Sequence, residues 1–461
     1  MHKIFIIQIV PLKFNCKINT VWIGVKQMRY SKRFLAIVAI ALSNILLFSC
    51  SSDKPQSLDS AKNIDLPVKT STLNLMTSWG GVDSKAGSLK EIIAKFENEN
   101  TSIKISNQSI FGDDYLPSLK TRFASGNEPD VFGLWPGSDI KYLVRANKVA
   151  DITDTLKQDR SWMDSFNQSS FSLTTYNNRI YGIPFELIFE GLFINKDLFL
   201  KCGVKIPTNY KELKEAIYIF RGSSIIPIAY NSSAEGSYIY QNMIASLGGS
   251  KGVEGYIVDN KINNYYIDAM NYMKELYDMG AFPKDALTLS SNERNELFIS
   301  KQAAMIVQGS WFIPYFYKYD ESVEMIPFPS MGEGDRKVPT GLGGGTFYIS
   351  KSAWNTPIGV DISIKFLKYL TSKETATYLS EKTGLISNLN MELKSDYSTL
   401  AKQSIGVYDS TQEKNRTAIP DHIIDRSIWE DIVIKQFPYF LEGKKTPEEI
   451  WGLAVEKILL N

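Results

Sequence analysis

The sequence contains very little histidine and cysteine. Among its 461 residues, only His2 and His422 are histidines, and only Cys16, Cys50 and Cys202 are cysteines. This scarcity excludes a multi-histidine metal site, and a histidine-based catalytic triad would have to use His422. Three cysteines do not form a disulfide framework. Much of the common hydrolytic and metal chemistry is therefore excluded by composition.

The chain also lacks a strong charge of either sign. It has 51 Lys and Arg against 50 Asp and Glu, with 44% hydrophobic and 22% charged residues. This globular composition excludes disorder, collagen and a multi-span membrane protein. The first 49 residues hold seven basic residues and no acid, which leaves 44 basic against 50 acidic residues, a net charge of about −6. A mildly acidic body predicts no nucleic-acid partner, because phosphate backbones bind basic surfaces.

Residues 1–49 have the pattern of a bacterial secretory signal. Three basic residues precede the apolar run 34–48, which ends just before Cys50. The alternative is a single membrane-spanning helix, but this run of 15 residues is short for a hydrocarbon core that needs about 20. Because Met28 opens a complete signal by itself, translation is expected to start at either Met1 or Met28.

The end of the apolar run resembles a lipoprotein box. A small residue, Ser49, directly precedes Cys50. In such a box the cysteine is lipidated and becomes the new N-terminus. We therefore expect Cys50 to carry a lipid anchor, and residues 50–71, rich in Ser, Asp, Lys and Pro, to form a solvated tether.

Hydrophobic patterning predicts alternating strands and helices at the start of the body. Strands are expected at residues 72–77, 103–105 and 131–135. One intervening helix is expected from a capping box at Ser88, and another around Leu119. This is the βαβ rhythm of a parallel sheet with covered faces. Ligands of such sheets bind in the loops that follow the strands, which here contain Trp79, residues 111–115 and Trp135.

The α/β pattern restarts beyond residue 184. Strands are expected at 192–194, 225–229, 303–307 and 346–349, and helices at 210–220, 238–247 and 265–279. Thr446, Pro447 and Glu449 predict the beginning of an amphipathic C-terminal helix. The roughly 390 folded residues suggest an α/β protein with two lobes.

Five short motifs follow one another along the chain. They are Asn127-Glu-Pro-Asp-Val131, Ile183-Pro-Phe-Glu186, Phe193-Ile-Asn-Lys-Asp-Leu-Phe199, Ala304-Met305 through Gly309-Ser-Trp311, and Phe366-Leu-Lys-Tyr-Leu-Thr371. In this order they resemble family 1 extracellular solute-binding proteins of the maltose-binding type. The resemblance implies a lipid-anchored or periplasmic receptor that delivers a sugar or oligosaccharide to the permease of an ABC importer. It implies no cofactor, no metal and no catalytic activity.

The resemblance also implies a fold and a location. We expect the type II periplasmic-binding-protein fold, with two α/β lobes that close by a hinge on a ligand between them. The first lobe is expected to take residues 72–183 plus about 330–385, and the second about 184–329 plus 386–461. The protein is expected to be a monomer, anchored in the periplasm or on the outer face of the cytoplasmic membrane.

Aromatic residues are candidates for the binding surface. A sugar presents apolar C–H faces, so its cleft needs flat aromatic platforms. Trp79, Trp135 and Trp311 each lie where a predicted strand meets a loop. Trp311 and Trp429 also match places where the resembled family carries a tryptophan, Trp311 a stacking one. The alternative for each is packing within a lobe.

Polar residues complete the predicted site. Glu186 is expected to face the cleft and accept sugar hydroxyls, or else to form a hinge salt bridge. Asp139 is expected either to accept hydroxyls or to cap the helix that follows. Tyr238 offers its hydroxyl or its ring. Gly343 and Gly344 let the backbone approach a ligand, or form a turn between the lobes.

Two other functions stay open. A glycoside hydrolase needs paired carboxylates, but the spacing of Glu186 and Glu190 in an extended segment separates them by about 13 Å, beyond either hydrolase geometry. The sequence has no P-loop. The second alternative is a binding protein for another solute, such as an oligopeptide, a polyamine or a metal, and the scarcity of His and Cys disfavours the metal.

Overall fold

The computed structural model describes residues 70–316, 321–332, 335–391 and 398–460. They belong to one of two units into which the chain divides, the unit that begins at Pro67. The predicted signal region, Cys50 and nearly all of the predicted tether lie outside the described residues.

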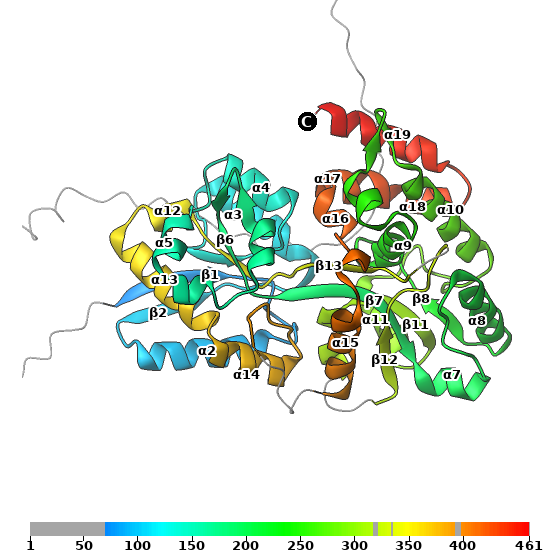
Figure 1. Ribbon diagram of the computed structural model, residues 1–461, viewed down its shortest axis with the longest axis horizontal. Helices are drawn as coiled ribbons and strands as arrows, with labels where there is room; N and C mark the ends of the chain where they lie inside the picture. Colours follow the sequence, from blue (N-terminus) through cyan, green and yellow to red (C-terminus); the bar gives the residue numbers. More distant parts are fainter. Residues whose placement is uncertain (1–69, 317–320, 333–334, 392–397, 461) are drawn as a thin grey trace, which may run out of the picture. The chain divides into compact units, whose positions relative to one another are not determined.

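A five-stranded sheet organises the first half of the body (Figure 1). Its strands, in spatial order, are β2 (Ile103–Asn107), β1 (Ser71–Met76), β3 (Val131–Gly133), β14 (Thr346–Ile349) and β6 (Gly182–Pro184). β1 pairs in parallel with β2 and β3, while β14 runs antiparallel to β3 and β6. The predicted parallel arrangement at the start of the body is therefore confirmed.

The helix α2 (Ala86–Glu99) connects β1 to β2, and α3 (Tyr115–Ser125) connects β2 to β3. The apolar face predicted for α2 is buried and comprises Leu89, Ile92, Ile93 and Phe96. The predicted capping box at Ser88 is wrong, because the helix begins earlier and Ser88 is a buried residue inside its first turn. Lys85 occupies the N-cap position without capping the helix through its side chain.

Further helices pack around this sheet. They are α4 (Ser138–Arg145), α5 (Thr153–Gln158), α6 (Arg160–Met163), α12 (Lys351–Trp354), α13 (Pro357–Leu370) and α14 (Lys373–Thr383). Two of the helices come from distant parts of the sequence and lie side by side, α2 and α14 (Figure 1). Tyr378 of α14 donates a hydrogen bond to Glu91 of α2, so late residues complete the early lobe.

A second sheet has the strand order β15-β13-β7-β11-β8, with β12 also paired to β7. Its strands are β7 (Leu187–Asn195), β8 (Ile226–Ala229), β11 (Ala303–Gly309), β12 (Val323–Ile326), β13 (Val338–Leu342) and β15 (Arg416–Thr417). The long strand β7 pairs antiparallel with β11, β12 and β13, which makes it the centre of this sheet. Two short hairpins lie apart from both sheets, β4 (Thr175–Tyr176) with β5 (Arg179–Ile180) and β9 (Ile257–Val258) with β10 (Lys261–Ile262).

Helices cover the second sheet and form apolar cores with it. They are α7 (Lys196–Cys202), α8 (Tyr210–Gly222), α9 (Tyr238–Glu254), α10 (Asn264–Asp278), α11 (Ser291–Ile299), α15 (Thr399–Ser410), α16 (Pro420–Ile423), α17 (Arg426–Ile428), α18 (Phe437–Leu441) and α19 (Pro447–Leu460). The predicted start of the last helix is confirmed. Thr446 Oγ1 accepts from the Glu449 amide at 3.2 Å, and the Glu449 carboxylate accepts from the Thr446 amide at 2.8 Å.

Three segments carry the chain between the sheets. Phe185 and Glu186 join β6 to β7, the glycine turn 343–345 joins β13 to β14, and residues 385–388 leave α14. The segments are hydrogen-bonded to one another, through the Gly343 amide to Glu186 O at 2.9 Å and the Leu187 amide to Ile386 O at 2.9 Å. Because β13 belongs to the second sheet, we propose that the first lobe resumes after residue 342 rather than near 330.

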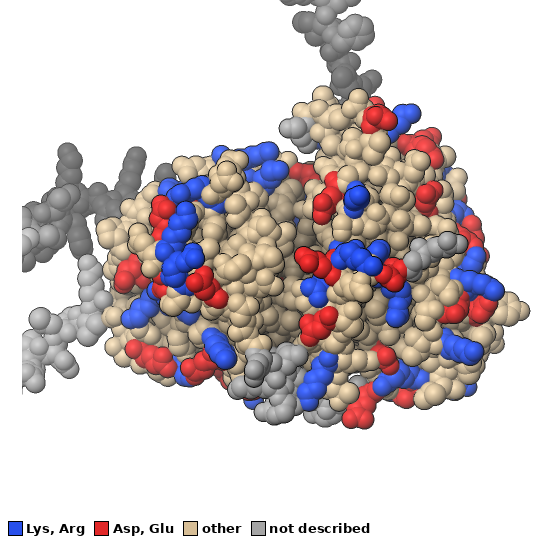
Figure 2. Space-filling view, in the orientation of Figure 1, with Lys and Arg blue, Asp and Glu red and all other residues tan. Residues whose placement is uncertain are grey.

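Each sheet has its own hydrophobic core, and together the two give the two-lobe α/β fold predicted from the sequence. On the face shown in Figure 2, acidic and basic side chains are interspersed and neither sign forms a continuous patch. Among the described residues, every helix is too short or too polar to cross a membrane.

Candidate functional site

A cavity of about 660 Å³ is lined by residues of both lobes, a size typical of small-molecule sites. Its lining includes residues from the loops after β1, β2 and β3, from the crossing segments, and from the loops after β8 and β11. The loops after the parallel strands are the ones at which the sequence predicts ligand binding. The rest of the lining comes from α3, from Ile188 and Glu190 of β7, and from the second lobe between residues 419 and 435.

Seven of the nine residues predicted to bind ligand line this cavity. They are Trp79, Trp135, Glu186, Tyr238, Trp311, Gly343 and Gly344. The remaining two, Asp139 and Trp429, are outside the lining. Tertiary folding therefore brings together residues from six separate stretches of sequence.

Trp311 and Tyr238 form an aromatic corner on the second lobe. Both are half-buried, and their rings meet edge to face with centroids 5.3 Å apart. The Trp311 ring lies over Gly309, where any Cβ would overlap it. Glycine at position 309 is therefore needed for the observed placement of the ring.

Trp135 lies on the first lobe and is also half-buried. The guanidinium of Arg426, from the second lobe, lies 4.6 Å from its ring centroid. Its indole Nε1–H is buried and has no hydrogen-bond partner among the described residues. Trp135 thus shares its aromatic surface with a protein cation.

Trp79 contributes little free surface to the cavity, because it is only 1% exposed. Its ring packs edge to face on Phe347 at 5.5 Å, and the Lys85 ammonium lies 5.6 Å from its centroid. Trp79 therefore borders the cavity mainly as part of the first core.

Trp429 follows its predicted alternative, packing within the lobe. It is fully buried and stacks on Tyr240 with ring centroids 5.5 Å apart. Its indole Nε1–H donates to Ser237 Oγ at 3.3 Å. The helical segment after α17 turns this side chain toward α9 and away from the cavity, so we withdraw its assignment as a ligand residue.

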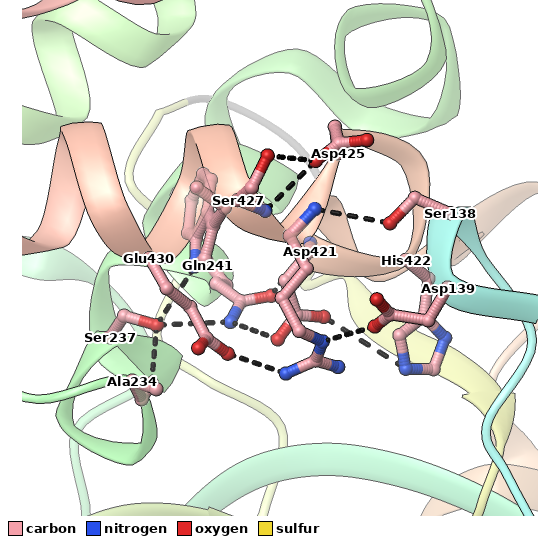
Figure 3. A network of polar contacts seen from close by, with 12 residues as sticks. Ser138, Asp139, Ala234, Ser237, Gln241, Asp421, His422, Asp425, Ser427 and Glu430 are labelled. Atoms are coloured by element: carbon pink, nitrogen blue, oxygen red, sulfur yellow. Dashed lines mark hydrogen bonds and ion pairs between the residues drawn. The ribbon is translucent and has the colours of Figure 1, made fainter. Parts of the chain in front are cut away.

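Asp139 serves neither of its predicted roles. It lies in the first turn of α4 without capping it, and both carboxylate oxygens are already paired. Lys120 Nζ lies 2.7 Å from Oδ1. Arg426 Nε lies 2.9 Å from Oδ2, a contact drawn at Asp139 in Figure 3. Because protein cations occupy its oxygens, we reassign Asp139 to a contact between the lobes.

Arg426 is the centre of a polar network that sequence reasoning missed (Figure 3). Besides Asp139, its guanidinium pairs with Glu430, and its backbone amide donates to Ser138 Oγ at 3.1 Å. Burial alone would lower the pKa of Arg426, but the carboxylates of Asp421, Glu430 and Asp139 outweigh burial and raise it. The i,i+4 spacing of Arg426 and Glu430 was the one sequence signal for this network.

Glu186 both lines the cavity and forms the salt bridge that was its predicted alternative. Its Oε2 accepts from the Gly345 amide at 2.7 Å, and its Oε1 lies 3.6 Å from Lys85 Nζ. Burial opposes the charge of Lys85, but Asp83 and Glu186 outweigh it and raise the Lys85 pKa. A Cβ at Gly343 would lie 2.5 Å from Glu186 Oε2. The glycine turn is therefore close to Glu186, as well as to the cavity.

Two further carboxylates line the cavity from the second lobe. Glu190 is only 1% exposed, and its Oε2 accepts from Asn242 Nδ2 at 2.8 Å. Asp421 Oδ2 accepts from Gln241 Nε2 at 3.2 Å. Burial raises the pKa of Glu190 well above its usual range, and the nearby charge of Asp421 raises it further. The sequence analysis considered Glu190 only as one of two paired carboxylates of a glycoside hydrolase, and no sequence motif pointed to Asp421.

Comparison with known proteins identifies the family of this two-lobe protein. Residues 82–377 match the family described as bacterial extracellular solute-binding protein. This chain belongs to that family. Solute-binding proteins of this family act outside the cytoplasm, and so does this one.

Individual relatives agree with this membership. The chain is 24% identical to the multiple sugar-binding protein of Streptococcus mutans over 75% of its own length and 80% of the relative's. It is 20% identical to lipoprotein LipO of Bacillus subtilis, over 91% of this chain and 83% of the relative. A solved structure from work on xylan utilisation by Caldanaerobius polysaccharolyticus superposes with a TM-score of 0.73 at 25% identity, covering 84% of this chain and 100% of that one. The family and these relatives show a binding protein rather than an enzyme, as predicted.

Proposed function

We propose that this solute-binding protein captures a sugar or oligosaccharide outside the cytoplasm and delivers it to an ABC importer. The aromatic corner of Trp311 and Tyr238, placed beside the buried carboxylate of Glu190, carries the proposal. An aromatic face packs on the C–H surface of a sugar ring, while an acidic oxygen accepts its hydroxyls. The relative named as a multiple sugar-binding protein supports the same ligand class.

The charges around the cavity agree with a hydroxyl-rich or cationic ligand. Seven acidic residues line it, Asp83, Glu186, Glu190, Glu235, Asp421, Glu430 and Asp431, against four basic ones, Lys85, Lys120, Arg426 and Lys435. This excess of acceptors disfavours an anionic solute. In the part of the chain that the structure describes, there is no group of three or more His, Cys, Asp or Glu suited to a metal ion.

A thermal-shift screen over mono- and oligosaccharides tests the ligand class. We expect at least one sugar to raise the melting temperature, since a ligand at 100 times its dissociation constant stabilises the folded state by about 2.7 kcal/mol. The same sugar should be recovered chemically intact after prolonged incubation. If an oligopeptide or polyamine raises the melting temperature while no sugar does, the proposed ligand class is wrong.

We further propose that Cys50 is lipidated and anchors the receptor. Cys50 lies outside the described residues, so this proposal comes from the sequence pattern and from the relative named as a lipoprotein. Cys50→Ser is expected to abolish metabolic labelling with palmitate and to release the protein from the membrane fraction. Cys202→Ser is the matched control, because Cys202 lies in α7 of the folded body, and should keep the label. Labelling that persists in Cys50→Ser contradicts the anchor.

A further inference from the structure

Two carboxylates on the second-lobe side of the cavity are held in the same way. Consecutive carboxamides of α9 each donate to one oxygen, Asn242 to Glu190 Oε2 and Gln241 to Asp421 Oδ2. The second oxygen of each carboxylate, Glu190 Oε1 and Asp421 Oδ1, is buried and has no hydrogen-bond partner among the described residues. Both residues line the cavity. Buried acceptors are nearly always satisfied, so two unsatisfied ones at a cavity indicate a missing donor.

The strand register places Glu190 beside the aromatic corner. Glu190 of β7 is directly opposite Gly309 of β11, and opposed residues of an antiparallel pair project from the same face. The space above Gly309 on that face is filled by the Trp311 ring. Asn242 Nδ2, which donates to Glu190, also donates to Tyr238 O at 2.9 Å. A ring lying on Trp311 would therefore have its edge near the free oxygen of Glu190.

The surroundings supply acceptors but little positive charge. Asn242 Oδ1 is also buried without a partner, but Asn242 is outside the lining of the cavity. Nearby cations are already paired, Arg294 with Glu235 at 2.8 Å and Arg426 with Asp139 at 2.9 Å. His422 Nε2 lies 3.9 Å from Asp421 Oδ1, and burial lowers the pKa of His422, which keeps the imidazole neutral at neutral pH.

We propose that this subsite binds a protonated amino group, so that the ligand contains an amino sugar with a free amine, its ring lying on Trp311. The proposal rests on the sugar-receptor function proposed above. An ammonium group donates three hydrogen bonds and carries a charge, whereas a sugar hydroxyl donates one and an N-acetyl group is neutral. Two unsatisfied oxygens at the cavity, both on carboxylates, match the charged ammonium best.

Binding of the ammonium group depends on the protonation state of Glu190. Because burial and Asp421 raise the pKa of Glu190, its carboxyl keeps a proton up to a higher pH than an exposed glutamate does. The titratable and charged groups near this region on neighbouring elements are Asp421 and His422 of α16, Tyr238 of α9 and Glu235 before it, Arg294 of α11, Arg426 of α17 and Glu430 after it. The ammonium favours the ionised carboxylate, so below that raised pKa binding releases the Glu190 proton to solvent. Affinity for the amine should therefore increase as pH rises toward the raised pKa of Glu190, until the amine itself loses its proton.

The test uses matched sets of sugars that differ at one position. Glucosamine, N-acetylglucosamine and glucose form one set, the galactose and mannose series form two more, and each is included as the β-1,4-linked dimer and trimer. Calorimetric titration at neutral pH should show that, in at least one set, the amine binds about tenfold or more tightly than both neutral members. Titration of that amine in two buffers with different ionisation heats should show proton release, which the neutral members lack.

Glu190→Gln keeps the shape of the side chain and removes its charge. In this variant the affinity for the amine should fall to about the affinity for the neutral sugars, and the proton release should disappear. Glu99→Gln, on the exposed face of α2, is the matched control and should retain both. If Glu190→Gln does not fold, as judged by its melting curve, Asp421→Asn provides the same comparison.

The outcomes separate this inference from the proposed function. If the neutral member of every set binds as tightly as the amine, the amino-sugar subsite is overturned and the sugar receptor stands. A preference for the amine that survives both Glu190→Gln and Asp421→Asn also overturns the subsite. If no sugar of any kind binds but spermidine does, the sugar-receptor function itself fails.

Discussion

Replacing Trp429 with alanine is expected to lower the free energy of unfolding by about 3 to 5 kcal/mol, the range for a large buried aromatic. The side chain is fully buried, stacks on Tyr240 and donates a hydrogen bond to Ser237, so its loss leaves a cavity and removes that hydrogen bond. Chemical denaturation monitored by circular dichroism measures the change. Ligand affinity of the variant, measured well below its melting temperature, should stay close to that of the wild type.

Tyr439→Ala is the matched control for this experiment. Tyr439 is an aromatic residue of the neighbouring helix α18, and it is 49% exposed. Its truncation should change the unfolding free energy by about 0.5 kcal/mol or less, because it opens no cavity. A Trp429 variant that keeps its stability but loses ligand affinity would return Trp429 to the binding surface, as the sequence had suggested.

Replacing Trp311 with alanine should have the reverse effect, weakening binding by roughly 5- to 150-fold, or about 1 to 3 kcal/mol. Trp311 is half-buried and lines the cavity, so its ring is available to a sugar face while little of the core depends on it. Calorimetric titration with the best sugar of the screen gives the affinity, and a thermal melt gives the stability. A variant that melts much earlier yet binds normally would make Trp311 a core residue.

Gly309→Ala tests the same platform without removing it. Since a Cβ at position 309 overlaps the Trp311 ring, the ring must move from its place beside Tyr238. Affinity should fall in the same direction as in Trp311→Ala. Gly203→Ala is unsuitable as a control, because Gly203 has a positive φ of 62° that favours glycine. Gly452→Ala is the better choice, because a Cβ there meets no atom within 4 Å.

Local sequence patterns were reliable where one face of an element is buried. The apolar residues of α2 recur at helical spacing and are buried as predicted, and the capping residues Thr446 and Glu449 mark the start of α19. Ser88 shows the limit of such a pattern. It has the spacing of a capping box, but residues 83–85 form a turn that starts the helix earlier, so the spacing is coincidental.

The spatial neighbours of each candidate ligand residue decide whether it faces the cavity or belongs to a core. The sequence arguments for Trp79, Trp311 and Trp429 were similar. In the structure, Trp79 borders the cavity from within a core, Trp311 faces the cavity, and Trp429 is buried in the other core. The difference depends on neighbours that are remote in sequence, such as Gly309 under Trp311 across a strand register and Tyr240 against Trp429. No local pattern contains that information.

The sequence by itself determined the α/β class, the order of the early strands, the likeness to solute-binding receptors and the acidic character of the body. These follow from periodicity, composition and motif order, which are properties of neighbouring residues. Only the tertiary structure decided that Arg426 crosses to Asp139, that Glu190 and Asp421 share a wall of the cavity, and that Trp429 is core. Those contacts join residues up to 287 positions apart, and their burial and pairing exist only after the chain has folded.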